Sequence, residues 1–144
     1  MYPNAFAAPP FAPRAAAPSA SLYARVAVET GVAGASPHKL VAMLFDGFVE
    51  AVAQAQGALA AGNVEAKGRA IGRAARIVDE GLKAGLDLSA GGDLAADLAD
   101  LYAYVTLRLI CANLHNDAGA LDECLRLVTP LRDAWRSIEA QTAR

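Results

Sequence analysis

Residues 36–61 read SPHKLVAMLFDGFVEAVAQAQGALAA, and this stretch decides the fold class. Ser36 is a favourable N-cap, and Pro37 suits the first position of a helix. Apolar residues then recur every three or four positions, as they do on one face of an amphipathic helix. The Gly62-Asn63 pair that follows is a helix-breaking signal, and Asn63 is the expected N-cap of the next helix. The stretch therefore predicts a long helix of roughly 35 Å.

Three further segments show the same periodicity and are expected to form helices over residues 63–85, 93–115 and 118–141. No segment shows the alternation typical of a strand. Four helices of similar length joined by short loops predict an all-α fold, an antiparallel up-down four-helix bundle. The positions expected to face its core are Val41, Phe45, Phe48, Val52, Ala55, Leu59, Val64, Ile71, Ala75, Val78, Leu82, Leu94, Leu98, Leu101, Val105, Leu109, Ala112, Leu121, Leu125, Val128, Leu131, Trp135 and Ile138.

Two boundaries depend on turn-forming residues. The stretch DLSAGG at residues 87–92 is expected to form the loop before the third helix, with Asp93 as the N-cap of that helix. Pro130 lies inside the fourth periodic segment, where it removes a backbone donor. It is expected to kink the fourth helix or to restart it with Thr129 as a new cap.

The N-terminal stretch has a different composition. Five of the seven prolines precede residue 19, and alanine supplies most of the remainder. Because repeated proline prevents a regular helix, we expect residues 1–19 to be a disordered tail and residues 20–142 to form one helical-bundle domain. Within that domain, residues 20–30 are expected to form a short additional helix that carries Tyr23.

The composition excludes several classes of function. The net charge is −2, so the overall electrostatics give no argument for binding nucleic acid or an anionic membrane. No apolar run approaches the length of a membrane span, and no secretory signal is recognisable. Cys111 and Cys124 lie outside any CxxC motif, which favours buried free thiols in a reducing compartment. These observations predict a soluble cytoplasmic protein without membrane insertion.

Motifs for catalysis or metal binding are weak. The sequence contains no HExxH, phosphate-binding GxxxxGK[ST] or GxSxG motif. Cys111 and His115 are spaced to share a helix face, and with Asp117 or Cys124 they would make a weak metal site. An isolated thiol near a helix-end histidine is the favoured interpretation. We therefore expect no enzyme activity, no cofactor and no metal.

Two alternative functions remain open at this point. A histidine phosphotransfer domain is also a four-helix bundle of this size, although neither His38 nor His115 has the mid-helix setting of a phosphorylated histidine. The second helix also carries a basic row, for which a solvated face with i,i+4 ion pairs is favoured over an RNA- or phosphate-binding site. That row consists of Arg69, Arg73, Arg76 and Lys83.

Two helices carry more apolar residues than a bundle core needs. In LYAYVTLRLICANL at residues 101–114, a second stripe remains after the core positions are removed. It consists of Tyr104, Leu107, Cys111 and Leu114. The first helix has a second row, made of Leu40, Met43 or Leu44, Gly47, Ala51 and Ala58. Part of this surplus is expected to allow close helix packing, but exposed apolar surface usually marks a partner site.

Spare apolar stripes favour two kinds of partner. A groove between helices suits an amphipathic segment of another protein, and the short helix with Tyr23 is placed to cover part of that groove when it is empty. The alternative is association with a second copy of the chain. We therefore expect a monomer or a weak homodimer.

Three blocks of sequence resemble one known family. SPHKLVAMLFDG at 36–47, IVDEGLKAGLDLSAGGDLAADLADLYAYVTLRLICAN at 77–113 and LRDAW at 131–135 are similar, in this order, to the FliS family of flagellar export chaperones. The resemblance covers about residues 22–137. The chain departs from the family in having His38 where Glu is usual, in the long tail before Tyr23 and in Pro130.

The resemblance implies binding without catalysis. Chaperones of this family hold the C-terminal segment of flagellin in the cytoplasm, prevent its premature polymerisation and deliver it to the flagellar type III export gate. The segment is disordered when free and helical when bound. Asn113 is expected to cap or hydrogen-bond that segment, or else to have a structural role at the helix end. The residues expected to line the partner surface are Tyr23, Leu40, Leu44, Gly47, Tyr104, Leu107, Cys111, Asn113 and Leu114.

Overall fold

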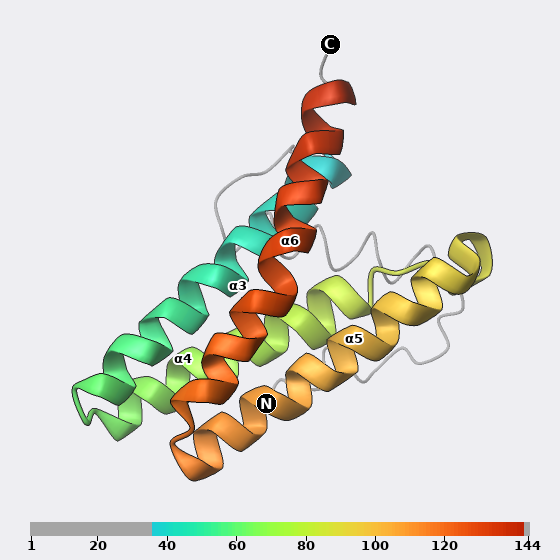
Figure 1. Ribbon diagram of the computed structural model, residues 1–144. Coiled ribbons are helices and arrows are strands. Elements are labelled where there is room, and N and C mark those ends of the chain that lie inside the picture. The colour runs from blue at the N-terminus through green and yellow to red at the C-terminus, as the bar shows by residue number, and fades with distance from the viewer. Residues whose placement is uncertain (1–35, 143–144) are drawn as a thin grey trace, which may run out of the picture.

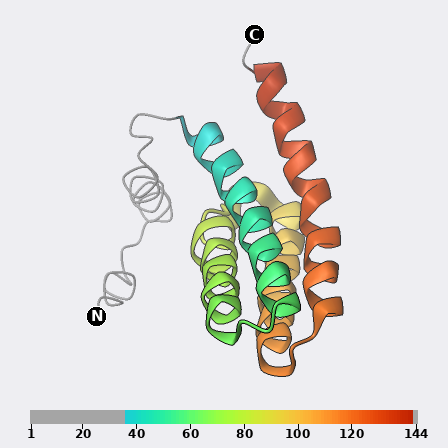
Figure 2. The same cartoon turned by 90° about the vertical axis from the view of Figure 1, so that its left-hand side faces the viewer.

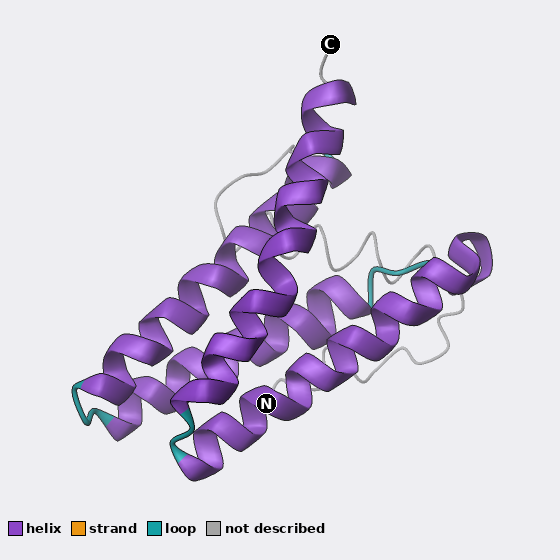
Figure 3. Cartoon of the chain, viewed as in Figure 1, coloured by secondary structure: helices purple, strands orange, loops and turns teal. Residues whose placement is uncertain are grey.

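A computed structural model describes residues 36–142 of the chain and the side chains up to residue 138. The predicted tail, the short helix at residues 20–30 and Tyr23 lie outside this part. The described elements are α3 (Pro37–Ala60), α4 (Val64–Arg76), the π-helical segment η1 (Ile77–Lys83), α5 (Leu88–His115) and α6 (Ala118–Thr142) (Figure 1). Over these residues there are helices and short loops but no strand (Figure 3).

The helices form the predicted all-α bundle. Helices that are consecutive in the chain are in contact, and α3 also contacts α6, so the four helices close into a ring. In the diagonal pairs α3–α5 and α4–α6, no Cα atoms approach within 8 Å of one another. Figures 1 and 2 show α3 and α6 running together as one pair, while α4 and α5 form a second pair that diverges from it. Each helix therefore has two neighbours and one outward face.

Helix starts follow the predicted caps at two positions. The Ser36 side chain accepts a hydrogen bond from the backbone N–H of Lys39 at 3.1 Å. The Asn63 side chain accepts one from Ala66, also at 3.1 Å. These bonds satisfy donors that have no partner within the first turn of a helix.

The predicted start of the third helix is wrong. Helix α5 begins at Leu88, and the Asp87 side chain caps it by accepting from the backbone N–H groups of Ser89 and Ala90, so Asp93 is not the cap. The first turn is separated from the rest by Gly92, which has φ of 57° and ψ of −137°. Glycine tolerates this backbone conformation because it has no Cβ. The DLSAGG stretch is thus a capped helical turn followed by a break.

Two other expectations about helix geometry change. The second predicted helix is α-helical only to Arg76 and continues as the π-helical segment η1. The fourth does not restart at Thr129, because α6 runs continuously through Pro130. Pro130 therefore removes one hydrogen bond from α6 without ending the helix.

The core consists mainly of the predicted residues. The largest completely buried side chains are Phe48, Val52, Val78, Val105, Leu109, Leu121, Cys124 and Val128. Val64, Leu94 and Ile138 were expected in the core but are exposed, since they lie toward the ends of their helices. Tyr102 is buried although the periodic pattern does not include it. No helix within residues 36–142 has the length and apolar character required to cross a membrane.

Candidate partner-binding surface

Helix α5 exposes a row of large apolar side chains on the side opposite the core. Its inward face places Tyr102, Val105, Leu109 and Ala112 in the hydrophobic core. On the outward face, the exposed fractions are 42% for Tyr104, 56% for Leu107, 48% for Ile110 and 71% for Leu114. We call these four exposed residues the α5 apolar row. The predicted exposure of Tyr104, Leu107 and Leu114 is confirmed.

Ile110 and Cys111 refine the predicted set. Ile110 was not predicted, although it lies three residues after Leu107 and four before Leu114, which places it on the same side of a helix. Cys111 is half-buried. The predicted stripe is therefore wider than the four positions read from the sequence.

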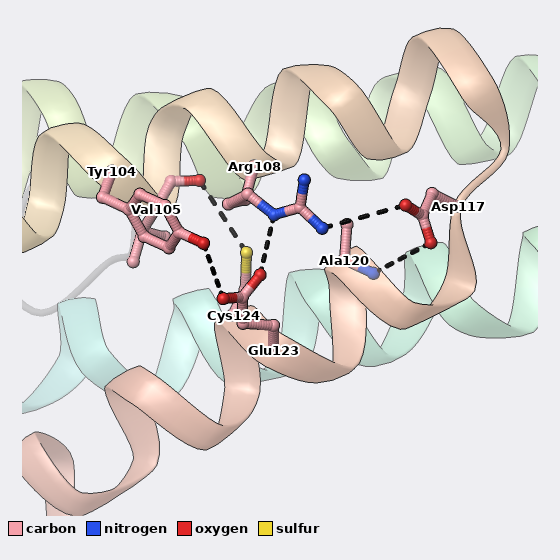
Figure 4. A network of polar contacts seen from close by, with 7 residues as sticks. All are labelled: Tyr104, Val105, Arg108, Asp117, Ala120, Glu123 and Cys124. Carbon is pink, nitrogen blue, oxygen red and sulfur yellow. Dashed lines mark hydrogen bonds and ion pairs between the residues drawn. The ribbon is translucent and has the colours of Figure 1, made fainter.

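A polar network holds Tyr104 at one end of the row (Figure 4). The Tyr104 hydroxyl donates to Glu123 Oε2 at 2.6 Å, and Arg108 Nε donates to Glu123 Oε1 at 2.7 Å. The Arg108 guanidinium also lies 3.8 Å from Asp117 Oδ2. Figure 4 shows Tyr104 and Arg108 on α5 pointing toward Glu123 on α6. The network therefore links α5 to α6 and orients the tyrosine ring.

The same network shifts the ionisation of its members. The hydrogen bonds from Tyr104 and Arg108 favour the Glu123 carboxylate and hold the pKa of that group below its usual value. The hydrogen bond to Glu123 raises the pKa of Tyr104, because the neutral hydroxyl is the donor. The same carboxylate raises the pKa of Arg108. Glu123 is thus ionised and Tyr104 neutral at neutral pH.

The two cysteines lie in different environments. The Cys124 thiol is completely buried and donates to the carbonyl oxygen of Val105 at 3.8 Å. Burial raises the pKa of Cys124 to about 12, so its thiolate is strongly disfavoured. Both thiols are free, as expected, but only Cys124 is buried.

The second apolar row predicted on α3 is not a surface. Leu40 and Leu44 are both buried, and Leu44 packs closely against Gly81 of η1. At Gly47, an added Cβ would lie 3.4 Å from Ile77 Cδ1. The expected exposure is therefore wrong for Leu40 and Leu44. The reason is that α3 contacts α4 and η1 on one side and α6 on the other, so it uses two apolar faces inside the bundle.

Lys67 is a buried residue that the sequence analysis missed. Its side chain is only 4% exposed, and its ammonium group donates to the Asn113 carbonyl oxygen at 3.0 Å and to Asn116 Oδ1. These acceptors lie at the C-terminal end of α5, where a cation is favoured by the helix dipole. The Asn113 backbone thus has a structural role at the helix end. The Asn113 side chain is exposed, and its Oδ1 lies toward Gly68 of α4.

The histidines and the basic row take part in local contacts. The His38 ring stacks on Trp135 with centroids 4.5 Å apart, and Trp135 Nε1 donates to the His38 carbonyl oxygen at 3.0 Å. In the basic row, Arg69, Arg73 and Lys83 form ion pairs with exposed carboxylates, which fits a solvated face. Among the described residues, no three His, Cys, Asp or Glu side chains are grouped so that they would hold a metal ion.

Comparisons with known proteins identify the family. The profile of the family described as "Flagellar protein FliS" matches residues 19–142. The flagellar secretion chaperone FliS of Salmonella typhimurium is 46% identical over 121 residues, which cover 84% of this chain and 90% of the relative. Flagellar secretion chaperone FliSB of Pseudomonas aeruginosa is 40% identical over 116 residues, with 81% and 91% covered. FliS of Bacillus subtilis is 32% identical over 108 residues, with 75% and 79% covered. By both measures, the chain belongs to the FliS family.

Proposed function

We propose that this protein is a non-enzymatic cytoplasmic chaperone that binds the C-terminal segment of flagellin. In this proposal it prevents premature polymerisation of flagellin and assists its export by the flagellar type III secretion system. The observation that carries the proposal is the α5 apolar row. The bundle core is complete without these side chains, and the row belongs to a chain whose relatives are named flagellar secretion chaperones.

The geometry of the row suits a helical segment. Residues 104–114 span about 15 Å along the helix axis at 1.5 Å per residue. A partner helix with apolar residues at positions i, i+3 or i+4 and i+7 would cover this length. A segment that orders on binding loses about 2–5 kcal/mol or more to that ordering, so it requires extensive apolar contact. Apolar burial contributes about 25 cal/mol per Å² toward that cost.

The orientation of Tyr104 also supports this proposal. Because Glu123 holds the tyrosine hydroxyl, the ring loses little freedom when a partner packs on it. Cys111 adjoins the row, whereas the exposed Asn113 side chain directs its Oδ1 toward Gly68 of α4. We place Leu40, Leu44 and Gly47 outside the proposed surface, because they pack within the bundle.

Calorimetric titration with a flagellin C-terminal peptide tests the proposal. Leu107→Glu is expected to weaken binding at least about tenfold, since it puts a charge into the apolar contact. The matched control is Leu88→Glu, because Leu88 is 57% exposed but lies before the Gly92 break. Both variants are expected to keep the wild-type far-UV circular dichroism spectrum.

Each outcome has a distinct meaning. The absence of binding and of helix gain with the wild-type protein would reject the function. Unchanged binding by a folded Leu107→Glu variant would reject the α5 apolar row alone. Sedimentation with and without the peptide tests the homodimer alternative, because self-association through the same row would compete with the peptide.

A further inference from the structure

We propose that α5 presents a docking stripe with an acidic end and an apolar end, and that its partner is an amphipathic helix bound in one orientation. The partner helix carries Lys or Arg at the end that meets the acidic residues and apolar side chains at the other end. This inference rests on the proposed function and specifies the chemistry of the bound segment. The stripe, called the α5 docking stripe below, consists of Asp93, Asp97, Asp100, Tyr104, Leu107, Cys111 and Leu114.

The spacing of these residues defines one continuous line. Successive members are separated by four and three positions in strict alternation from residue 93 to residue 114. This spacing keeps side chains on one side of a helix and is the seam that a coiled-coil partner follows. All members are exposed except the half-buried Cys111. The stripe covers about 31 Å of α5, roughly twice the length of its apolar part.

The acidic half is available for a partner. Within residues 36–142, the side chains of Asp93, Asp97 and Asp100 take part in no ion pair or hydrogen bond. By contrast, Asp46 pairs with Arg136 at 2.7 Å, and Asp79 lies 4.0 Å from Lys83. The three α5 carboxylates therefore lie exposed and unpaired on the outward face.

Charge complementarity determines the expected orientation. A helix laid along the stripe meets three carboxylates first and then large apolar side chains. Cationic residues gain favourable contacts at the acidic end, whereas apolar residues placed there would have to desolvate carboxylates without pairing them. Reversing the segment loses both sets of contacts. The order of charged and apolar residues in the partner thus selects one direction of binding.

The test uses the flagellin C-terminal segment and two triple variants of the full chain. Asp93→Asn, Asp97→Asn and Asp100→Asn together neutralise the acidic end. The matched control changes the charge equally at exposed sites elsewhere. Its substitutions are Glu65→Gln, Asp79→Asn and Asp133→Asn. The first variant is expected to bind about tenfold more weakly than wild type, since each exposed ion pair contributes modestly, and the control is expected to bind normally.

Salt dependence and charge reversal separate a direct contact from a structural effect. The difference between wild type and the acidic-end variant is expected to shrink as NaCl rises from about 50 mM to about 500 mM. A peptide whose Lys and Arg residues at the matching end are replaced by Glu is expected to bind weakly to wild type. Reversing Asp93, Asp97 and Asp100 to Lys is expected to restore its binding.

The possible failures are distinguishable. Normal affinity and normal salt dependence in the acidic-end variant, together with binding by wild type, would overturn the docking stripe and leave the proposed function standing. Absence of rescue by the Lys variant would also overturn the orientation. Absence of binding by the wild-type protein would overturn both the proposed function and this inference.

Discussion

Gly81 provides a sharp test of how closely η1 approaches α3. A Cβ at this position would lie 3.1 Å from Leu44 Cδ2 and 3.2 Å from Leu44 Cδ1. Favourable contacts between carbon atoms lie at about 3.5–4.0 Å, so the Leu44 side chain would have to move by about 0.5 Å. Leu44 is buried and has little room to do so. We therefore expect Gly81→Ala to destabilise the bundle.

The expected magnitude combines two opposing effects. Replacing glycine by alanine within a helix stabilises by about 1 kcal/mol, whereas overpacking a core costs about 1–3 kcal/mol. The net destabilisation at Gly81 is then about 0–2 kcal/mol. Gly57 is the matched control, because it lies in α3 and an added Cβ there meets no atom within 4 Å. Gly57→Ala is expected to stabilise the protein by up to about 1 kcal/mol.

Urea unfolding followed by circular dichroism measures both effects. A difference of about 2 kcal/mol between the variants separates their midpoints by about 1 M when m is about 2 kcal/mol/M. In a Leu44→Ala background the close contact is gone, so Gly81→Ala is expected to become neutral or stabilising. The reasoning fails if Gly81→Ala raises the midpoint as much as Gly57→Ala does. It also fails if the Leu44→Ala background leaves the effect unchanged.

Three further predictions concern the core, the thiols and the polar network. Phe48→Ala is expected to lower the free energy of unfolding by about 3–5 kcal/mol, because Phe48 is completely buried; a loss under about 1 kcal/mol in urea unfolding would contradict this. Iodoacetamide at about pH 8 is expected to modify Cys111 in the folded protein and Cys124 only after unfolding, as peptide mass spectrometry would report. The pKa of Glu123 is lower in the folded protein than its unfolded value of about 4.5, so the ionised carboxylate stabilises the fold above that pH. This stabilisation is lost as the pH falls through the folded pKa. Thermal melts are therefore expected to show a stability gap between wild type and Glu123→Gln that closes in acid; a gap independent of pH would refute it.

The α5 apolar row shows how much of the surface can be predicted from sequence periodicity. Tyr104, Leu107 and Leu114 are visible in the sequence as a second stripe because side-chain directions along one helix follow from spacing alone. The same spacing on α3 gave the wrong answer for Leu40 and Leu44. A periodic pattern reveals that a helix has two apolar faces, but it does not reveal how many neighbouring helices will cover them.

Lys67 and η1 illustrate the same limit. In the sequence, Lys67 resembles a surface lysine, and its burial depends on carbonyl and amide acceptors at the end of a helix that lies 46 or more residues further along the chain. The π-helical geometry of η1 accompanies the close contact between Gly81 and Leu44 of α3. Neither arrangement is encoded in the immediate neighbours of these residues.

Local sequence was thus sufficient to predict the number of helices in the described region, the caps at Ser36 and Asn63 and the end of α5 near Asn116. These features depend on backbone groups within one turn, whose partners lie a few residues away. The tertiary arrangement decided which apolar faces are covered. Because α3 has neighbours on two sides and α5 keeps an uncovered outward face, similar stripes became core in one helix and candidate binding surface in the other.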